Sequence, residues 1–214
     1  MVKLTKTPLP PNVSINSEQD YRNDEIFGIL FSDCNGKCYI CENKPATLNV
    51  EHLVPHRNDP KLKYCWENLF IACGHCNGTK SDTFDNIINP TKIDPEKHIS
   101  LSVEISGDLI DSVAVMPHKE DESTMQTVNL LMLVYNGGST AIKRAGSSNL
   151  RNAQLLPDVR LFYQYIENHR KEPDLGYSDM IREEINRAAK FAAFKRKIVY
   201  DNPQLRSEFA EDLE

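Results

Sequence analysis

Two Cys-x-x-Cys pairs constrain the fold of this chain more than any other feature of its sequence. Cys38 and Cys41 form the first pair, and Cys73 and Cys76 form the second. Each pair can direct two sulfur atoms at one point, and two such pairs complete the tetrahedral shell that Zn²⁺ prefers. Because the protein would fill all four positions, no position is left for water. The spacing therefore predicts a structural zinc that clamps the ends of the intervening loop.

Other uses of the six cysteines are less consistent with the sequence. The N-terminus has no apolar signal segment, and no stretch approaches the roughly 20 apolar residues of a membrane span. We therefore expect a cytoplasmic protein whose paired cysteines bind metal instead of forming disulfides. An alternative zinc shell would include His75, Cys34 or Cys65. We favour the paired cysteines and expect Cys34 and Cys65 to be buried free thiols.

The net charge of -6 argues against a protein that coats nucleic acid, because non-specific affinity comes mostly from neutralising phosphates. Positive side chains nevertheless gather on one predicted helix, namely Arg187, Lys190, Lys195, Arg196 and Lys197. Two interpretations stay open. We favour a solvated helix face over a face that contacts phosphates.

The N-terminal half predicts short elements around the cysteine pairs. Residues 1–16 are rich in Pro, Asn and Thr and predict an extended arm. Ser17 and Asp20 predict a capping box at the start of a helix that ends near Phe31. The remaining predicted elements are a short strand over residues 48–54 and a helix over residues 77–88.

The second half changes from strand to helix periodicity. Apolar residues alternate on both sides of Ser106-Gly107-Asp108, which predicts a β-hairpin of residues 98–105 and 109–115. The helical period then predicts helices over residues 125–135, 139–146 or further, 157–170 and 178–200. The sequence thus predicts an α+β protein with a largely helical C-terminal region.

A further motif lies between and after the cysteine pairs. It consists of Val50-Glu51-His52-Leu53-Val54-Pro55, then Trp66-Glu67-Asn68-Leu69, then Cys76-Asn77-x-x-Lys80-Ser81-Asp82. This combination resembles the HNH endonuclease motif in its zinc-knuckle form, a ββα-metal unit. The signature residues would be His52, Asn68 and Asn77, and Asn77 stands where many members have His. The similarity covers about a fifth of the chain.

The resemblance implies hydrolysis of phosphodiester bonds. Attack by water needs a general base, and an imidazole titrating near neutrality suits that role, so His52 is the expected base. Glu51 and Asn77 would supply hard oxygen ligands to a catalytic Mg²⁺ or Mn²⁺. Adjacent strand residues point to opposite faces, so the convergence of Glu51 and His52 on one phosphate comes from the resemblance. Asn68 would hold the loop that orients His52.

Three further residues near the motif, His56, His75 and Lys80, have alternative roles. His56 could contact phosphate or be exposed, and His75 could be a knuckle residue or a substitute metal ligand. Lys80 also lies inside the motif. His52 and His56 stand four apart, as in zinc metalloproteases, but Glu51 precedes the first His and Pro55 interrupts the run, which excludes a metalloprotease helix.

Beyond the motif the chain resembles the HNH nuclease subunit of Septu-type anti-phage systems and their retron-linked relatives. The similarity rests on Asp94-Pro95-Glu96-Lys97-His98 and on Thr127-Val128-Asn129-Leu130. It implies an ABC-type ATPase partner subunit, and the chain has no Walker A motif of its own. The expected regions are an arm (1–16), an HNH nuclease domain (17–95), a hairpin and linker (96–122) and a helical region for partner or nucleic-acid contact (123–214).

The sequence therefore predicts a metal-dependent endonuclease of an anti-phage system. DNA is the preferred substrate and tRNA the second. The alternative is a non-catalytic zinc module that binds nucleic acid or protein, and it leaves the joint occurrence of Glu51, His52, Asn68 and Asn77 unexplained. A homing or restriction enzyme would need a recognition helix, and the sequence has no signature of one.

Overall fold

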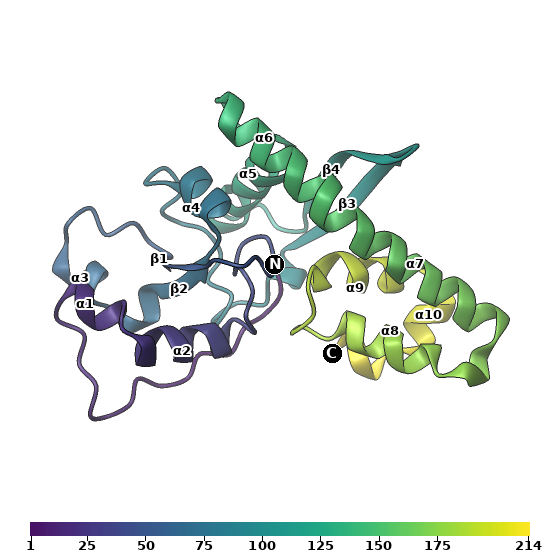
Figure 1. Ribbon diagram of the computed structural model, residues 1–214, viewed down its shortest axis with the longest axis horizontal. Helices are drawn as coiled ribbons and strands as arrows, with labels where there is room; N and C mark the ends of the chain where they lie inside the picture. The colour runs from purple at the N-terminus through teal and green to yellow at the C-terminus, as the bar shows by residue number, and fades with distance from the viewer.

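Two small antiparallel sheets and a larger set of helices make up the chain, in a computed structural model that describes residues 1–214. Strand β1 (Asn49–His52) pairs with β2 (Leu69–Ala72), and β3 (Ile99–Ser106) pairs with β4 (Leu109–Pro117). Figure 1 shows β1 and β2 at one end of the molecule and helices α7 to α10 at the other. The predicted α+β class is confirmed. None of the helices is long and apolar enough to cross a membrane.

The N-terminal segment, residues 1–16, packs against the protein at both of its ends, and its middle is more exposed. They contain no helix or strand, yet Met1, Val2 and Leu4 are buried in the main hydrophobic core. The Trp66 indole N–H donates a hydrogen bond of 2.8 Å to the Thr7 carbonyl, which fixes the segment beside β2. This segment is therefore part of the packed structure.

The capping box at Ser17 and Asp20 is confirmed, but the helix that follows is divided in two. Helix α1 (Glu18–Tyr21) ends at once, and α2 (Asp24–Asp33) begins after Asn23. The Asn23 side chain accepts a hydrogen bond from the Ile26 N–H at 2.8 Å. Asparagine competes with the helical backbone and favours caps, which explains the break.

Strands β1 and β2 and the following helix α4 (Gly74–Lys80) form a compact unit. Glu51 pairs with Phe70 and His52 with Leu69 across the two strands. A short helix α3 (Pro60–Lys63) and a 3₁₀ turn (Trp66–Asn68) lie in the connecting loop.

The predicted helix over residues 77–88 is wrong at both ends. Helix α4 begins three residues earlier because the Cys73 sulfur caps it, accepting from the Cys76 N–H at 3.4 Å. The helix ends before Ser81, whose φ of 50° lies in the left-handed region that an α-helix cannot contain.

The hairpin of β3 and β4 is confirmed. Its turn contains Gly107 with φ 57°, a conformation that glycine adopts without a Cβ penalty. Helix α5 (Glu122–Asn136) packs on β4, and the Asn136 side chain bonds both the N–H and the C=O of Val113 at 2.8 Å. Asn136 thereby caps the outer edge of β4 in place of another strand.

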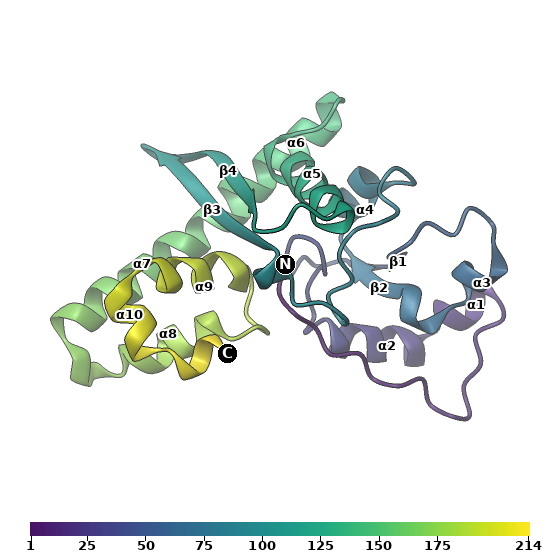
Figure 2. The same ribbon diagram turned by 180° about the vertical axis from the view of Figure 1, so that it is seen from behind.

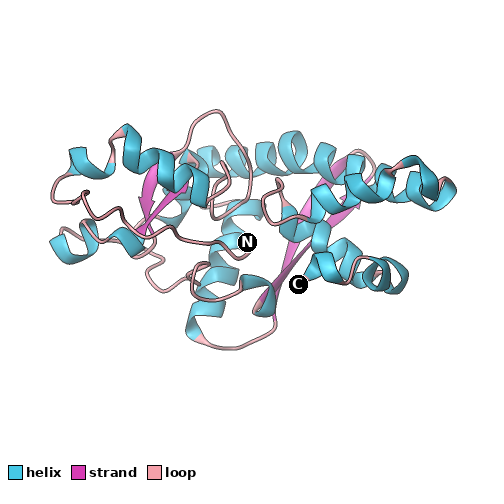
Figure 3. Cartoon of the chain, turned by 90° about the horizontal axis from the view of Figure 1, so that it is seen from below, coloured by secondary structure: helices cyan, strands magenta, loops and turns pink.

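Helix α6 (Ala141–Asn149), a π-helical segment (Leu150–Leu155) and helix α7 (Leu156–Lys171) follow one another without interruption. They form the long rod that crosses the molecule in Figures 1 and 3. Gly146 lies inside this rod and does not end it. The His75 ring packs against Gly146. A Cβ atom at this position would lie only 2.5 Å from His75 Nδ1, so a larger residue would clash with the ring.

The predicted single helix over residues 178–200 is wrong. Helix α8 (Tyr177–Ile185) ends well before α9 (Ala192–Asp201) begins, and α10 (Pro203–Glu208) follows. In the break, the buried Phe191 has φ 53°, and its N–H donates to the Glu42 carbonyl at 3.2 Å. The Lys37 ammonium donates to the Ala189 carbonyl at 3.0 Å. These tertiary contacts override the helical periodicity.

The basic residues of this region are ion-paired inside the protein. Lys195 and Arg196 are buried, and they contact Asp158 and Glu96 at 2.6 Å. Arg187 also pairs with Glu96, at 3.1 Å. The solvated face that we favoured is therefore wrong for these residues, and they offer no bare positive surface to phosphates.

The hydrophobic core has two parts. The larger is a cluster of 40 buried residues that includes the cysteine pairs, the first sheet, and parts of β3, β4, α5, α7 and α9. The smaller is a cluster of 7 buried residues between α7, α8, α9 and α10. Figure 2 shows these four helices together at one end of the molecule.

Candidate metal centre and active site

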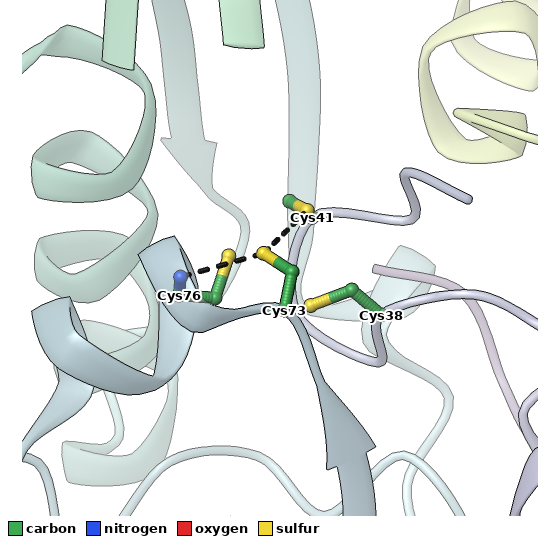
Figure 4. Close-up of side chains that lie close together, drawn as sticks. All are labelled: Cys38, Cys41, Cys73 and Cys76. Atoms are coloured by element: carbon green, nitrogen blue, oxygen red, sulfur yellow. Dashed lines mark hydrogen bonds between the residues drawn. The ribbon is translucent and has the colours of Figure 1, made fainter. Parts of the chain in front are cut away.

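The four paired cysteines converge on one point. The Sγ atoms of Cys38, Cys41, Cys73 and Cys76 all lie within 4.8 Å of one another, and all four residues are buried. Figure 4 shows the first pair on its loop, Cys73 at the end of β2 and Cys76 in the first turn of α4. This arrangement is the one that a tetrahedral zinc site requires.

Backbone hydrogen bonds hold the first knuckle in place. The Cys38 N–H donates to the Asn43 carbonyl at 2.9 Å, and the Tyr39 N–H donates to the Ile71 carbonyl at 3.1 Å. The Tyr135 hydroxyl, from α5, donates to the Cys41 carbonyl at 2.8 Å. The knuckle is thus tied to both the first sheet and the C-terminal half.

The chemistry of the donor set fits a divalent cation. All six cysteines are free thiols, so no disulfide competes for the sulfurs. Burial raises the pKa of the Cys76 thiol well above its usual range. Several thiolates could coexist in this site only with a compensating charge. The buried four-cysteine cluster is consistent with the expected structural zinc.

The alternative ligands lie elsewhere. The ring of His75 donates through Nε2 to the Val134 carbonyl at 2.8 Å, which joins α4 to α5. Burial raises the pKa of the Cys34 thiol to about 11, and Cys34 does not belong to the cluster. Cys65 is half-buried and also lies outside it. The expectation of a buried thiol is thus confirmed for Cys34 and wrong for Cys65.

His52 ends β1 with a defined ring orientation. Its Nε2 lies 2.9 Å from the Lys63 carbonyl. A carbonyl oxygen only accepts, so Nε2 carries the proton and Nδ1 keeps its lone pair. Burial lowers the pKa of His52, which favours the neutral imidazole. The rings of Tyr21 and His56 pack edge-on against it, at centroid distances of 5.6 and 4.7 Å.

Asn68 fixes the loop that follows β1. Its Oδ1 accepts from the Val54 N–H at 2.8 Å, and its Nδ2 donates to the carbonyls of Val54 and Leu62 at 2.9 and 3.0 Å. The side chain is buried. Leu62 directly precedes Lys63. The Asn68 side chain therefore also positions the Lys63 carbonyl, which accepts the hydrogen bond from His52 Nε2.

Glu51 lies beside Lys80 and α4. The fully buried Lys80 ammonium donates to Glu51 Oε1 at 3.0 Å and to the His52 carbonyl at 2.8 Å. Burial raises the pKa of Glu51, although Lys80 opposes that shift. Asn77 is half-buried and lies three residues before Lys80 on α4.

These predicted residues do not form a second ligand cluster of the same kind. Only the four cysteines bring three or more His, Cys, Asp or Glu side chains close enough together to hold a metal ion. His56 is engaged locally, because its Nδ1 accepts from the Asn58 N–H at 3.0 Å. The structure brings His52, His56 and the Asn68 loop together, and it pairs Glu51 with Lys80.

Three further contacts escaped the sequence analysis. Tyr21 packs on His52, the Lys63 carbonyl orients its ring, and Tyr135 supports the first knuckle. The role of a backbone carbonyl cannot be predicted from the sequence, because every residue has one. The contact between Tyr21 and His52 joins distant segments, and local periodicity does not encode such contacts.

The fold and this site define the class of protein, an α+β chain built around a buried four-cysteine cluster with a histidine-bearing strand beside it. The chain is a distant homologue of the Septu protein PtuB of Bacillus thuringiensis, with 33% identity over 116 residues. That match covers 45% of this chain and 45% of the relative, so it spans less than half of the relative's length.

Other comparisons found no counterpart. No family model matches the chain, and no solved structure matches it. The similarity to a Septu protein that the sequence predicts is confirmed through PtuB.

Proposed function

We propose that this protein is a metal-dependent HNH endonuclease that hydrolyses phosphodiester bonds, with DNA as the preferred substrate and tRNA as the second. The observation that carries the proposal is the orientation of His52. Its Nε2 is committed to the Lys63 carbonyl, which leaves Nδ1 as a proton acceptor in a residue held by the Asn68 loop. The held ring orientation, with Nδ1 left as the acceptor, is what a general base requires.

In this proposal β1, β2 and α4 are the ββα-metal unit. His52 Nδ1 takes a proton from the attacking water while Nε2 donates to the Lys63 carbonyl, which stabilises the imidazolium that forms. The lowered pKa keeps the base neutral near pH 7. Asn68 acts as a positioning residue, because its hydrogen bonds hold the backbone on both sides of the His52 ring.

The catalytic ion in this proposal is Mg²⁺ or Mn²⁺. Glu51 and Asn77 would hold it, since Lys80 binds Glu51 through Oε1 and Oε2 is the oxygen left to face a cation. Carboxylate and amide oxygens are the hard ligands these ions prefer. When bound, such an ion would stabilise the charge that develops on the phosphate. Lys80 holds the Glu51 carboxylate in place.

The partner in this proposal is an ABC-type ATPase subunit of a Septu-type system. The homology to PtuB supports it, because PtuB is a Septu protein. In the same proposal residues 17–95 are the nuclease region, preceded by the arm (1–16), and residues 96–122 connect it to the helical region (123–214). The shared hydrophobic core would make these regions mechanically coupled.

A second candidate function is a non-catalytic zinc module that binds nucleic acid or protein. One observation favours it. Glu51 is already paired with Lys80, and no three carboxylate or histidine side chains converge near His52. A binding module would need the four-cysteine cluster, but it would not need the oriented His52 ring.

Cleavage assays separate the two candidates. Purified protein would be incubated with supercoiled plasmid, single-stranded DNA and tRNA, with Mg²⁺ or with chelator, alone and with the protein encoded next to it. We expect Mg²⁺-dependent cleavage that His52→Ala abolishes while zinc content and thermal stability are retained. Asn149→Ala, an exposed side chain on α6, is the matched control. Undiminished cleavage by His52→Ala would refute the proposal, and binding without any cleavage would favour the zinc module.

A further inference from the structure

A groove runs between β3 and α9, away from the candidate active site. It consists of two adjoining hollows with volumes of about 890 and 370 Å³, which share Leu101 and Lys197. The first reaches the N-terminal segment at Lys3, and the second reaches α7 and the start of α10. Figures 1 and 2 both show the N-terminus, the beginning of β3 and α9 side by side. We call this feature the β3–α9 groove.

The acidic side chains on the walls of the groove are mostly neutralised within the protein. In the first hollow, Asp94 pairs with Arg187 at 3.0 Å, and Glu96 pairs with Arg196 at 2.6 Å. In the second hollow, Asp201 pairs with Lys197. Because each of these carboxylates has a cationic partner, none of them contributes a bare negative charge.

The groove also presents cations that have no acidic partner. Lys3 and Lys97 border the first hollow and Arg170 borders the second. All three are exposed, and none forms an ion pair, whereas Glu214 is the one unpaired acid on the rim. A protein with a net charge of -6 thus carries a locally positive groove. Such a patch attracts anionic partners selectively.

Apolar side chains lie between these cations. Leu101 is shared by both hollows, and Phe194 and Ile166 line the second; all three are buried and form the apolar floor of the groove. Two tyrosines on the walls, Tyr163 and Tyr200, are 46% and 56% exposed. Exposed tyrosine beside apolar pockets is typical of protein-binding surfaces, because it supplies contact area at a small entropic cost.

We infer that the β3–α9 groove binds an extended acidic segment of a partner protein, with carboxylates on Lys3, Lys97 and Arg170 and apolar side chains between them. A nucleic-acid strand fits less well. Its continuous row of phosphates needs a continuous row of cations, whereas the unpaired cations of the groove are only Lys3, Lys97 and Arg170, with apolar and aromatic side chains on the same walls. The inference is independent of nuclease activity, because the groove shares no residue with the His52 site.

Fluorescence anisotropy of labelled peptides with the full-length chain tests this inference. The probe is a short peptide that alternates Glu or Asp with Leu and Tyr, and the comparison peptide replaces each acid by its amide. We expect the acidic peptide to bind at least about tenfold more tightly than the amide peptide and to weaken as salt is raised.

The variant that locates the site is the double substitution Lys3→Glu with Lys97→Glu. We expect it to weaken the acidic peptide at least about tenfold. Lys92→Glu, an exposed lysine outside the groove, is the matched control and should leave binding unchanged. Equal binding of both peptides, no effect of the double substitution, or no binding at all would overturn the inference. Displacement of the acidic peptide by single-stranded DNA through the same lysines would also overturn it. His52→Ala should bind the peptide normally. A negative result for peptide binding would therefore leave the nuclease proposal unaffected.

Discussion

Replacing Lys80 by methionine tests whether the β1–α4 junction is held by a buried ion pair. Lys80 is fully buried, and its ammonium contacts the Glu51 carboxylate at 3.0 Å and the His52 carbonyl at 2.8 Å. Lys80→Met keeps an unbranched side chain that is one atom shorter, and it leaves a largely buried carboxylate and a carbonyl without their donor. The Glu51 side chain is 13% exposed, so water can solvate it only in part.

The expected decrease in the free energy of unfolding follows from the loss of one partner of a buried ion pair. Removing such a partner costs about 3–5 kcal/mol, because the other charge stays buried without compensation. In a chain of this length, about 1 kcal/mol lowers the melting temperature by roughly 2–4 °C. We therefore expect Lys80→Met to lower the melting temperature by about 6–20 °C.

Differential scanning calorimetry of a double-mutant cycle measures this coupling. Lys80→Met with Glu51→Gln removes both charges, so it should recover at least half of the loss caused by Lys80→Met alone. Lys92→Met, at an exposed lysine, controls for the loss of a positive charge. A loss below about 1 kcal/mol for Lys80→Met, or additive losses in the cycle, would refute the reasoning.

Three further predictions concern the metal cluster, the Asn68 loop and Lys6. Cys73→Ser should lose bound zinc, measured by metal analysis, and should melt at a lower temperature; retained zinc would contradict the four-sulfur site. Asn68→Ala strands three hydrogen-bonding groups and should cost about 2–4 kcal/mol in urea unfolding, whereas Asn149→Ala should cost almost nothing. Burial lowers the pKa of Lys6 from 10.5 to about 8, so the unfolded chain binds more protons between these values. Stability should therefore rise with pH across that window, and Lys6→Met should flatten the rise; an unchanged rise would exclude Lys6 as its cause.

The sequence predicts the metal cluster and the hairpin because local signals determine them. The two cysteine pairs need only their spacing to specify a shared ion, and the alternation around Gly107 specifies both strands of the hairpin. The capping box at Ser17 is a further local signal that the structure confirms. In the hairpin turn, the capping box and each cysteine pair, the determining residues lie within a few positions of one another.

Other features depend on tertiary contacts that local patterns do not contain. The break before α9 arises where Phe191 meets Glu42, far away in the sequence. Helix α4 starts early because a cysteine sulfur acts as its cap, which is not a usual capping residue. The basic residues near Arg196 look solvated in the sequence because their acidic partners, such as Glu96, lie on other elements.

In the candidate active site, too, the sequence identifies residues, whereas their tertiary contacts come only from the structure. The motif selects His52 and Asn68, and the structure adds the contacts that give them physical meaning, namely the Lys63 carbonyl and the loop at Val54. The Glu51–Lys80 pair was not predicted, because an acid and a base in one motif do not reveal whether they contact each other. The roles of Glu51 and Asn77 as metal ligands stay proposals.

Zinc content, fold and cleavage can be followed together as a chelator is added. The four buried thiolates are assigned to a structural zinc, and a separate, exchangeable ion is proposed beside His52. We expect cleavage to disappear at chelator concentrations that leave the zinc bound and the circular dichroism unchanged, and added Mg²⁺ to restore it. Simultaneous loss of cleavage, zinc and fold would contradict the division into a structural and a catalytic metal.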